Sequence, residues 1–188
     1  HIHLYLQFAM EKKLRNWLIA NKIKIKWGGF LFIFSHQARA IMCVYFLSHN
    51  KCRPLKILIR KFLRAHYHIE CSCSNIGDGL RLPHPRNIII GAEEIGNNVQ
   101  INQNVTIGGN MKKTCIRPWG EQKRPIIGNN VVIYTNAVVG GPVVIEDHVI
   151  VGANCVCTHD IPSNTLIYNT SQQSSRKILV TDGSFQYI

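Results

Sequence analysis

Aliphatic residues recur every sixth position through most of the second half of this 188-residue chain. One series of inward candidates consists of Ile127, Ile133, Val139, Ile145, Val151 and Cys157. A second series, four positions further on, consists of Val131, Ala137, Val143, Val149, Cys155 and Ile161. Ile95, Ile101 and Ile107 carry the same frame upstream. A period of six matches neither an α-helix nor a long strand, and no segment between the repeats is long enough for a crossover helix.

Each hexad is interpreted as one short strand followed by one turn. Gly, Asn and Asp fill the turns because they tolerate left-handed backbone angles. Three hexads then close one triangular coil, and stacked coils bury a continuous core. The sequence therefore predicts a mainly β fold, a parallel β-helix over residues 69–170. Cys155 and Cys157 occupy inward positions and are predicted to fill that core.

Two interruptions break the frame. Between Leu82 and Ile95 the register slips by one residue just after His84, which makes Ile89 the expected inward position. Residues 109–125 are polar and basic and should form a loop that leaves the prism. Long loops of this kind are often functional.

The N-terminal part of the chain is strongly basic. Thirteen Lys or Arg and one acid lie between Glu11 and Arg64, and the whole chain carries a net charge of +12. Apolar residues at helical spacing predict two or three amphipathic helices within residues 10–68, broken at Gly28–Gly29 and at Pro54. These helices are expected to cap the prism. Peripheral contact with a membrane or an anionic acceptor is a second interpretation, compatible with the first.

The ends of the chain and its composition set further limits. Residues 1–9 look like a histidine tag with a protease site, and residues 171–188 are expected to form a C-terminal tail. The seven cysteines lack framework spacing, which favours unpaired thiols in a reducing compartment. No apolar run approaches the roughly 20 residues that span a bilayer, so a cytoplasmic protein is expected. No nucleic-acid-binding motif is found, and no nucleic-acid partner is expected.

His84 is the clearest candidate for chemistry. It lies in Leu82-Pro83-His84-Pro85, beside the register slip, where two prolines restrict the backbone. A histidine is well suited to accept a proton near neutral pH. An ordinary surface turn histidine would fit the same position. His66, His68, His148 and His159 lack a zinc-ligand pattern, and no metal is expected.

The stretches IGDGLRLPHPRNIIIG, IGNNVQINQNVTIGG and IIGNNVVIYTNAVVGG together resemble the serine acetyltransferase-like family of hexapeptide-repeat acyltransferases, in its short form. The resemblance covers residues 69–167. It implies left-handed coiling, a homotrimer with active sites between prisms, and acetyl-CoA-dependent O-acetyl transfer. By this resemblance His84 is the general base.

The resemblance also implies roles for other residues. Glu70 would orient His84, although Ile69 is the residue in register, and Asp78 is the alternative. Residues expected to bind acetyl-CoA are Gly108, Gly109, Ala137, Ala153, Arg176 and Lys177. Residues expected to bind the acceptor are Gln103, Lys123 and Arg124.

The sequence departs from the family at positions that hold the acceptor. Pro83 replaces an acid before His84, and Lys123-Arg124 replaces an Arg-His pair. Tyr168-Asn169-Thr170-Ser171 replaces a turn that contacts CoA. A sugar of a surface polysaccharide is therefore slightly favoured as acceptor, with L-serine of cysteine biosynthesis as the close alternative. A non-catalytic scaffold remains a separate possibility.

Overall fold

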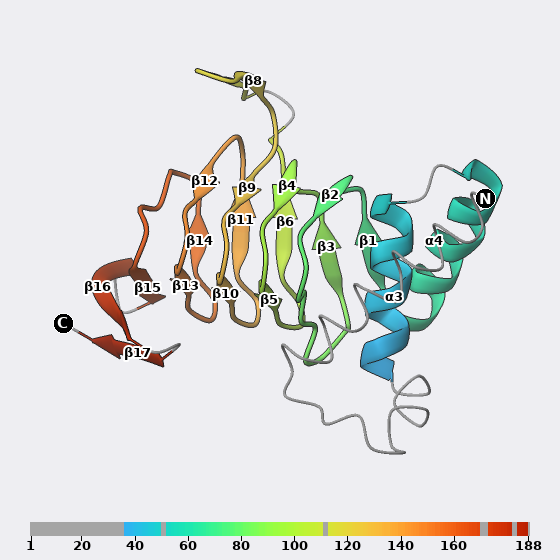
Figure 1. Cartoon of the computed structure of the whole chain (residues 1–188), viewed down its shortest axis with the longest axis horizontal. Helices are drawn as coiled ribbons and strands as arrows, with labels where there is room; N and C mark the ends of the chain where they lie inside the picture. The colour runs from blue at the N-terminus through green and yellow to red at the C-terminus, as the bar shows by residue number, and fades with distance from the viewer. Residues whose placement is uncertain (1–35, 50–51, 111–112, 170–172, 182–183, 188) are drawn as a thin grey trace.

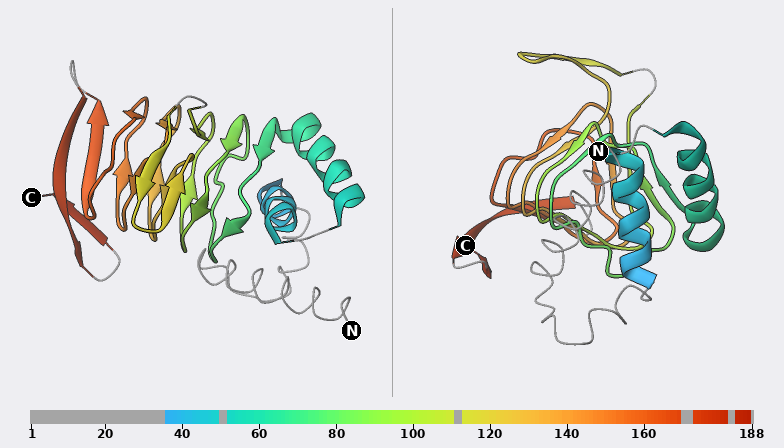
Figure 2. Two further views of the ribbon diagram at one scale, coloured as in Figure 1. Left: turned by 90° about the horizontal axis from the view of Figure 1, so that it is seen from above. Right: turned by 45° about the vertical axis from the view of Figure 1, so that its right-hand side comes forward.

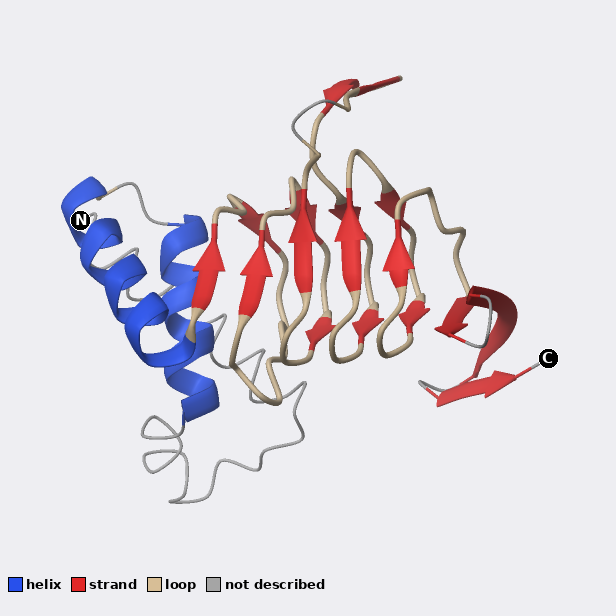
Figure 3. Ribbon diagram, turned by 180° about the vertical axis from the view of Figure 1, so that it is seen from behind, coloured by secondary structure: helices blue, strands red, loops and turns tan. Residues whose placement is uncertain are grey.

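The computed structural model describes residues 36–49, 52–110, 113–169, 173–181 and 184–187. Within them the chain forms a three-sided prism of stacked coils with two helices at one end (Figure 1). Sheet one contains β1 (Ile69–Cys71), β3 (Ile88–Ile90), β6 (Thr106–Gly108), β11 (Val138–Gly140) and β14 (Val156–Cys157). Its parallel strands lie side by side in Figure 3. The predicted mainly β, parallel repeat fold is confirmed.

The other two sides of the prism are built in the same way. Sheet two contains β5 (Gln100–Ile101), β10 (Val132–Ile133), β13 (Ile150–Val151) and β15 (Thr165–Asn169), extended by β16 (Gln173–Thr181) and β17 (Ser184–Tyr187). Sheet three contains β2 (Asn75–Ile76), β4 (Glu94–Ile95), β9 (Ile126–Ile127) and β12 (Val144–Ile145). The chain runs from sheet one to three to two and back, and the successive coils overlie one another in the right panel of Figure 2.

The core is a set of aliphatic columns inside the prism. Partners in register, such as Ile90 with Ile107 and Val139 with Cys157, are fully buried. Cys155 and Cys157 are also fully buried, as predicted. Burial raises the pKa of the Cys157 thiol to about 12. None of the seven cysteines forms a disulfide, which agrees with the absence of framework spacing.

Left-handed residues turn the corners of the prism. Where sheet two passes to sheet one, Asn87, Asn104, Asn136 and Asn154 all have φ between 53° and 60°. Asparagine tolerates this region better than other side chains except glycine. The amide of Asn87 donates to Asn104 Oδ1 (3.1 Å), and that of Asn136 donates to Asn154 Oδ1 (3.1 Å). Each corner residue thus bends its own coil, and in these two pairs the side chains also bond between neighbouring coils.

The predicted register slip is wrong in its details. Ile88 and Ile90 are fully buried, whereas Ile89 is 42% exposed on the outside of β3. Ile90 aligns with Ile107, so the turn that contains His84 is longer than the later turns at this corner, and the following turn is shorter. In the sequence, a longer turn followed by a shorter turn has the same appearance as a single shift of register.

Two helices cover the first coil of the prism. Helix α3 (His36–His49) buries Ile41, Val44 and Tyr45, and the Tyr45 hydroxyl donates to Gly77 O (3.0 Å). Helix α4 (Arg53–Tyr67) follows, and neither helix is long and apolar enough to span a bilayer. Pro54 lies in the first turn of α4, where a proline gives up no helical hydrogen bond, so the predicted break at this proline corresponds to the boundary between the two helices. The predicted break at Gly28–Gly29 lies outside the described residues.

The segment after the last coil is strand, not an irregular tail. β16 pairs antiparallel with β15, and β17 pairs antiparallel with β16. Residues 109–125 leave the prism and contain a hairpin of β7 (Cys115–Arg117) and β8 (Gly120–Gln122). Neither feature has the six-residue period, which explains why the repeat did not predict it.

Replacing Ile90 with Ala should destabilise the protein by about 2–5 kcal/mol, because it empties part of a fully buried column. Ile89→Ala is the matched control on the same strand and should change the free energy of unfolding by about 0.5 kcal/mol. Urea unfolding of both variants measures the difference. A larger loss for Ile89→Ala would show that the strand faces the other way.

Candidate active site

The expanded turn presents His84 to solvent at the corner between sheets two and one. Its flanks are fixed from three sides. Gln37 of α3 donates from Nε2 to Pro83 O (2.6 Å), Pro85 is buried, and Arg86 N donates to His84 O (2.8 Å). An exposed imidazole on a braced turn is free to meet a substrate while its backbone stays in place.

Gln103 lies one coil further along the same corner. Asn104 N donates to Arg86 O (3.1 Å), so the turn of Gln103 stacks on the turn of His84. The Oε1 atom of Gln103 is buried and has no hydrogen-bond partner among the described residues. A buried acceptor without a donor is costly, and an acceptor or cofactor N–H or O–H would satisfy it after a small side-chain movement. The structure thus brings Gln103 and His84 to one edge of the prism.

Of the two acids considered for orienting His84, one is bound to an arginine and the other lies at a different corner. Glu70 is on the outer side of β1, and its Oε1 accepts from Arg64 Nη2 at 3.0 Å. Asp78 lies at the corner between sheets three and two, where its backbone O accepts from Asn98 N (2.7 Å). Asp78 and His84 are therefore at different corners. The orienting role of Glu70 stays a prediction, and Arg64 competes for its carboxylate.

Four of the residues predicted to bind cofactor or acceptor lie at the base of the loop: Gly108, Gly109, Lys123 and Arg124. The backbone of Gly109 lies so close to the other end of the loop that a Cβ would be 2.6 Å from Lys123 O and 2.9 Å from Arg124 Cγ. Gly109 therefore admits no side chain. A Cβ built on Gly108 would meet no atom within 4 Å. The same is true of Gly140, which is the partner of Gly108 in register. Gly140 was not among the predicted residues, although it belongs to a second Gly-Gly pair.

Two other predicted cofactor positions differ in their surroundings. Ala153 is exposed in a turn at the His84 corner. Ala137 is fully buried, so its methyl group belongs to the core and is not available to a cofactor. Its place in the inward series of the repeat gives the physical reason. Arg176 and Lys177 lie in β16 opposite Leu166 and Thr165, and their side chains lie outside the described part of the chain.

A network that the sequence did not reveal holds the hairpin against the prism. Arg117 donates to both carboxylate oxygens of Asp160 (2.7 Å each) and to Pro142 O (3.0 Å). Its Nε also donates to Gln122 Oε1 (3.0 Å). Gln122 is fully buried, and its Nε2 donates to Val143 O (3.0 Å) and Arg124 O (2.9 Å). Arg124 is therefore held through its backbone oxygen, and Lys123 lies between it and the fixed Gln122.

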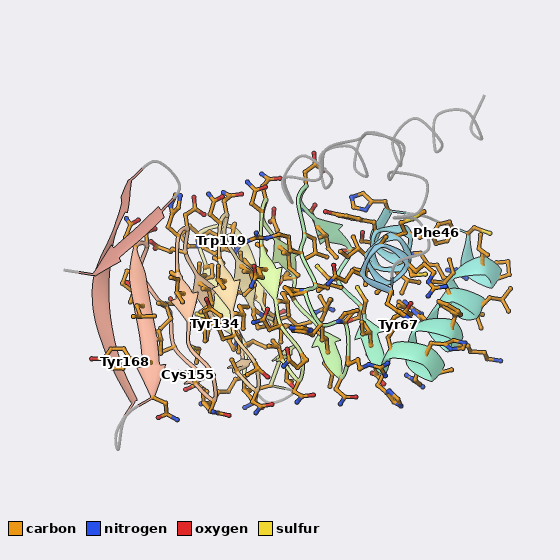
Figure 4. The ribbon with its side chains drawn as sticks, turned by 90° about the horizontal axis from the view of Figure 1, so that it is seen from below. Phe46, Tyr67, Trp119, Tyr134, Cys155 and Tyr168 are labelled. Atoms are coloured by element: carbon orange, nitrogen blue, oxygen red, sulfur yellow. The ribbon has the colours of Figure 1, made fainter. Side chains whose placement is uncertain are left out.

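The far end of the hairpin is apolar and exposed. Ile116 is 80% exposed and Trp119 is 63% exposed. Figure 4 labels Trp119 of the hairpin, Tyr134 and Tyr168 of the prism, and Tyr67 beside the helices. Within one chain the hairpin leaves sheet one at the ends of its strands, whereas His84 precedes their beginnings. A single chain therefore does not join the His84 corner to the loop.

Asp160→Asn should loosen the hairpin, because it replaces a bidentate ion pair with a neutral amide. Hydrogen exchange of the amides of β7 and β8 should become faster. Glu121→Gln is the matched control: it removes an exposed ion pair with Lys123 (3.0 Å) and should leave exchange nearly unchanged. Equal exchange in the two variants would show that Arg117 does not hold the hairpin.

The same ion pair predicts an effect of acid. The hydrogen bond from Arg117 lowers the pKa of Asp160 below its usual value. The contribution of Asp160 should therefore be complete above about pH 4, the ordinary range of aspartate, and should be lost as the pH falls through the lowered pKa. A lower protection factor of the hairpin amides in acid, after correction for the intrinsic exchange rate at each pH, would be the sign of this titration, and Asp160→Asn should not show it.

Known proteins resemble this chain in both sequence and fold. Residues 124–159 match the bacterial transferase hexapeptide family (six repeats). A serine acetyltransferase of Staphylococcus xylosus is 36% identical over 134 residues, which are 70% of this chain and 59% of that protein. One of Helicobacter pylori is 32% identical over 105 residues, 55% of this chain and 58% of that protein. The chain thus spans less than two thirds of the length of these relatives.

Solved structures extend the likeness to the whole fold. Serine acetyltransferase of Neisseria gonorrhoeae superposes with a TM-score of 0.72 at 21% identity, covering 92% of this chain and 69% of that one. The enzyme of Vibrio cholerae gives a TM-score of 0.73 at 17% identity, covering 93% and 68%. These likenesses confirm the left-handed β-helix. In repeat, sequence and fold, the chain resembles the serine acetyltransferase-like proteins of the hexapeptide-repeat class, as its motifs predicted.

Proposed function

We propose that the protein transfers an acetyl group from acetyl-CoA to an acceptor hydroxyl, with His84 as general base. The observation that carries the proposal is the turn of His84. The repeat is expanded at this turn, and the expansion exposes an imidazole on a backbone fixed by Gln37, Pro83 and Pro85. A regular coil does not need a longer turn to close, so the expansion supports a role for His84 beyond the fold.

The proposed reaction needs a base that takes the proton of the acceptor hydroxyl. It also needs groups that hold the thioester carbonyl of acetyl-CoA in place. The neutral His84 imidazole takes the proton of the acceptor hydroxyl, whose oxygen attacks the thioester carbonyl. The C–S bond then breaks, and the thiolate of CoA takes up a proton as it leaves. Backbone N–H groups near Gly108 and Gly109 are proposed to stabilise the oxyanion, and Gly108 leaves room for the cofactor.

A trimer would join the two halves of the site. The His84 corner and the loop lie at opposite ends of the strands of sheet one in one chain. We propose that the groove between two prisms brings the His84 of one copy to Lys123, Arg124 and the glycines of the next. The relatives' fold supports this arrangement, in which Arg124 and Lys123 would meet acceptor or cofactor charge.

L-serine is the acceptor best supported by the relatives, which are named serine acetyltransferases. The preference for a sugar, drawn from the sequence, gains no support from these names. One structural observation supports a sugar acceptor. Trp119 is largely exposed on a hairpin held by Arg117, and an aromatic face suits a sugar ring. A sugar of a surface polysaccharide is therefore the second candidate, with the cytoplasmic face of the membrane as its expected place of transfer.

His84→Ala should lower kcat by about 10²–10⁴-fold, because it removes the general base. Release of free thiol from acetyl-CoA in the presence of acceptor measures the rate. His159→Ala removes another exposed turn histidine and should leave the rate unchanged. Full activity of His84→Ala would overturn the mechanism, and a hydrolase activity without acceptor would overturn the acceptor step.

The acceptor is identified by the same thiol-release measurement with a panel of L-serine, hexoses, N-acetylated sugars and sialic acid. We expect turnover with L-serine to exceed turnover with every sugar. Trp119→Ala separates the two candidates further: it should reduce turnover of a sugar but spare that of L-serine. Failure of all acceptors, with no binding of CoA, would favour a non-catalytic prism.

A further inference from the structure

Helix α4 carries large apolar side chains on its outer side. Leu55 is 41% exposed, Leu58 63% and Phe62 38%. At 100° per residue these three positions share one helical face. The side that packs on the protein is a different one, formed by the buried Leu63 and Tyr67. An apolar face of this kind on a helix is expensive to leave in water.

The rest of the helix is cationic. Its charged residues are Arg53, Lys56, Arg60, Lys61 and Arg64, and it contains no acid. Ile57, which is 53% exposed, lies among three of these cations on the wheel. A second copy of α4 contains no acid either, so it would offer these cations no opposite charge. A surface of negative charge over an apolar layer complements both properties at once.

We propose that α4 lies on an anionic lipid bilayer. Leu55, Leu58 and Phe62 enter the boundary between headgroups and acyl chains, while the lysines and arginines bind lipid phosphates. The helix would lie in the plane of the membrane, as amphipathic helices of this composition do. The contact is peripheral and reversible, because only one short helical face is inserted.

The helical end of the prism is also the end where the His84 turn lies. Helices α3 and α4 pack against each other, and Gln37 of α3 bonds directly to Pro83 O (2.6 Å). Membrane contact through α4 would therefore hold the His84 turn near the bilayer. This last step rests on the proposed function, and it concerns the second candidate acceptor, a sugar attached to lipid. The binding of α4 to lipid does not depend on it.

Co-sedimentation of the full chain with vesicles tests the surface. We expect binding to vesicles of equal parts phosphatidylcholine and phosphatidylglycerol, and little binding to phosphatidylcholine alone. Leu58→Glu should lower the partition coefficient by about tenfold or more, since it puts a charge into the apolar boundary. Ile57→Glu makes the same chemical change on the cationic side and should lower it by about threefold or less.

Two further measurements separate the possible failures. Circular dichroism and thermal unfolding show whether each variant is folded, and the solution mass shows whether the face joins two copies. Equal losses in Leu58→Glu and Ile57→Glu, or equal binding to neutral and anionic vesicles, would overturn the proposal. A lower mass of Leu58→Glu without vesicle binding would instead assign the face to self-association. Because vesicle binding is measured without acetyl-CoA, it is independent of the outcome for acetyl transfer.

Discussion

The left-handed conformation of the corner residues determines the rest of the structure. Each coil turns where Asn87, Asn104, Asn136 or Asn154 adopts a positive φ, and the side chains bond between neighbouring coils. These corners hold neighbouring coils in register. The register in turn places the aliphatic side chains of successive coils in contact with one another in the core. If a corner fails, a column residue leaves the core, because successive side chains of a strand face opposite sides.

The candidate site lies where this regularity is interrupted. At one corner the turn lengthens and presents His84, and at another the chain leaves the prism for residues 109–125. Both interruptions are braced by contacts outside the repeat: Gln37 holds the first, and Arg117, Gln122 and Asp160 hold the second. The repeat thus supplies a rigid frame, and the exceptions to it supply the groups proposed to bind and react.

The period of six was sufficient to predict the prism and its core, because two inward residues per hexad leave little choice of fold. It could not place Ile88 and Ile90 correctly, since a longer turn followed by a shorter one mimics a single slip. The motif around His84 identified the exposed turn from sequence alone. The pair of Arg117 and Asp160 could not be predicted, because 43 positions separate them and only the folded coils bring them together. Ala137 was assigned to a cofactor from resemblance, although its own place in the repeat indicated burial.

Different structures cover the two ends of the prism, and both prevent further coils from adding to it. Helices α3 and α4 cover β1 and β2, so no further coil can pair with sheet one or three there. At the other end sheet two continues as antiparallel β16 and β17. An antiparallel strand is a poor template for another parallel coil, so one prism cannot simply extend another. Coils of this kind could in principle stack without limit. The two ends of this prism fix the number of coils and disfavour the growth of fibres.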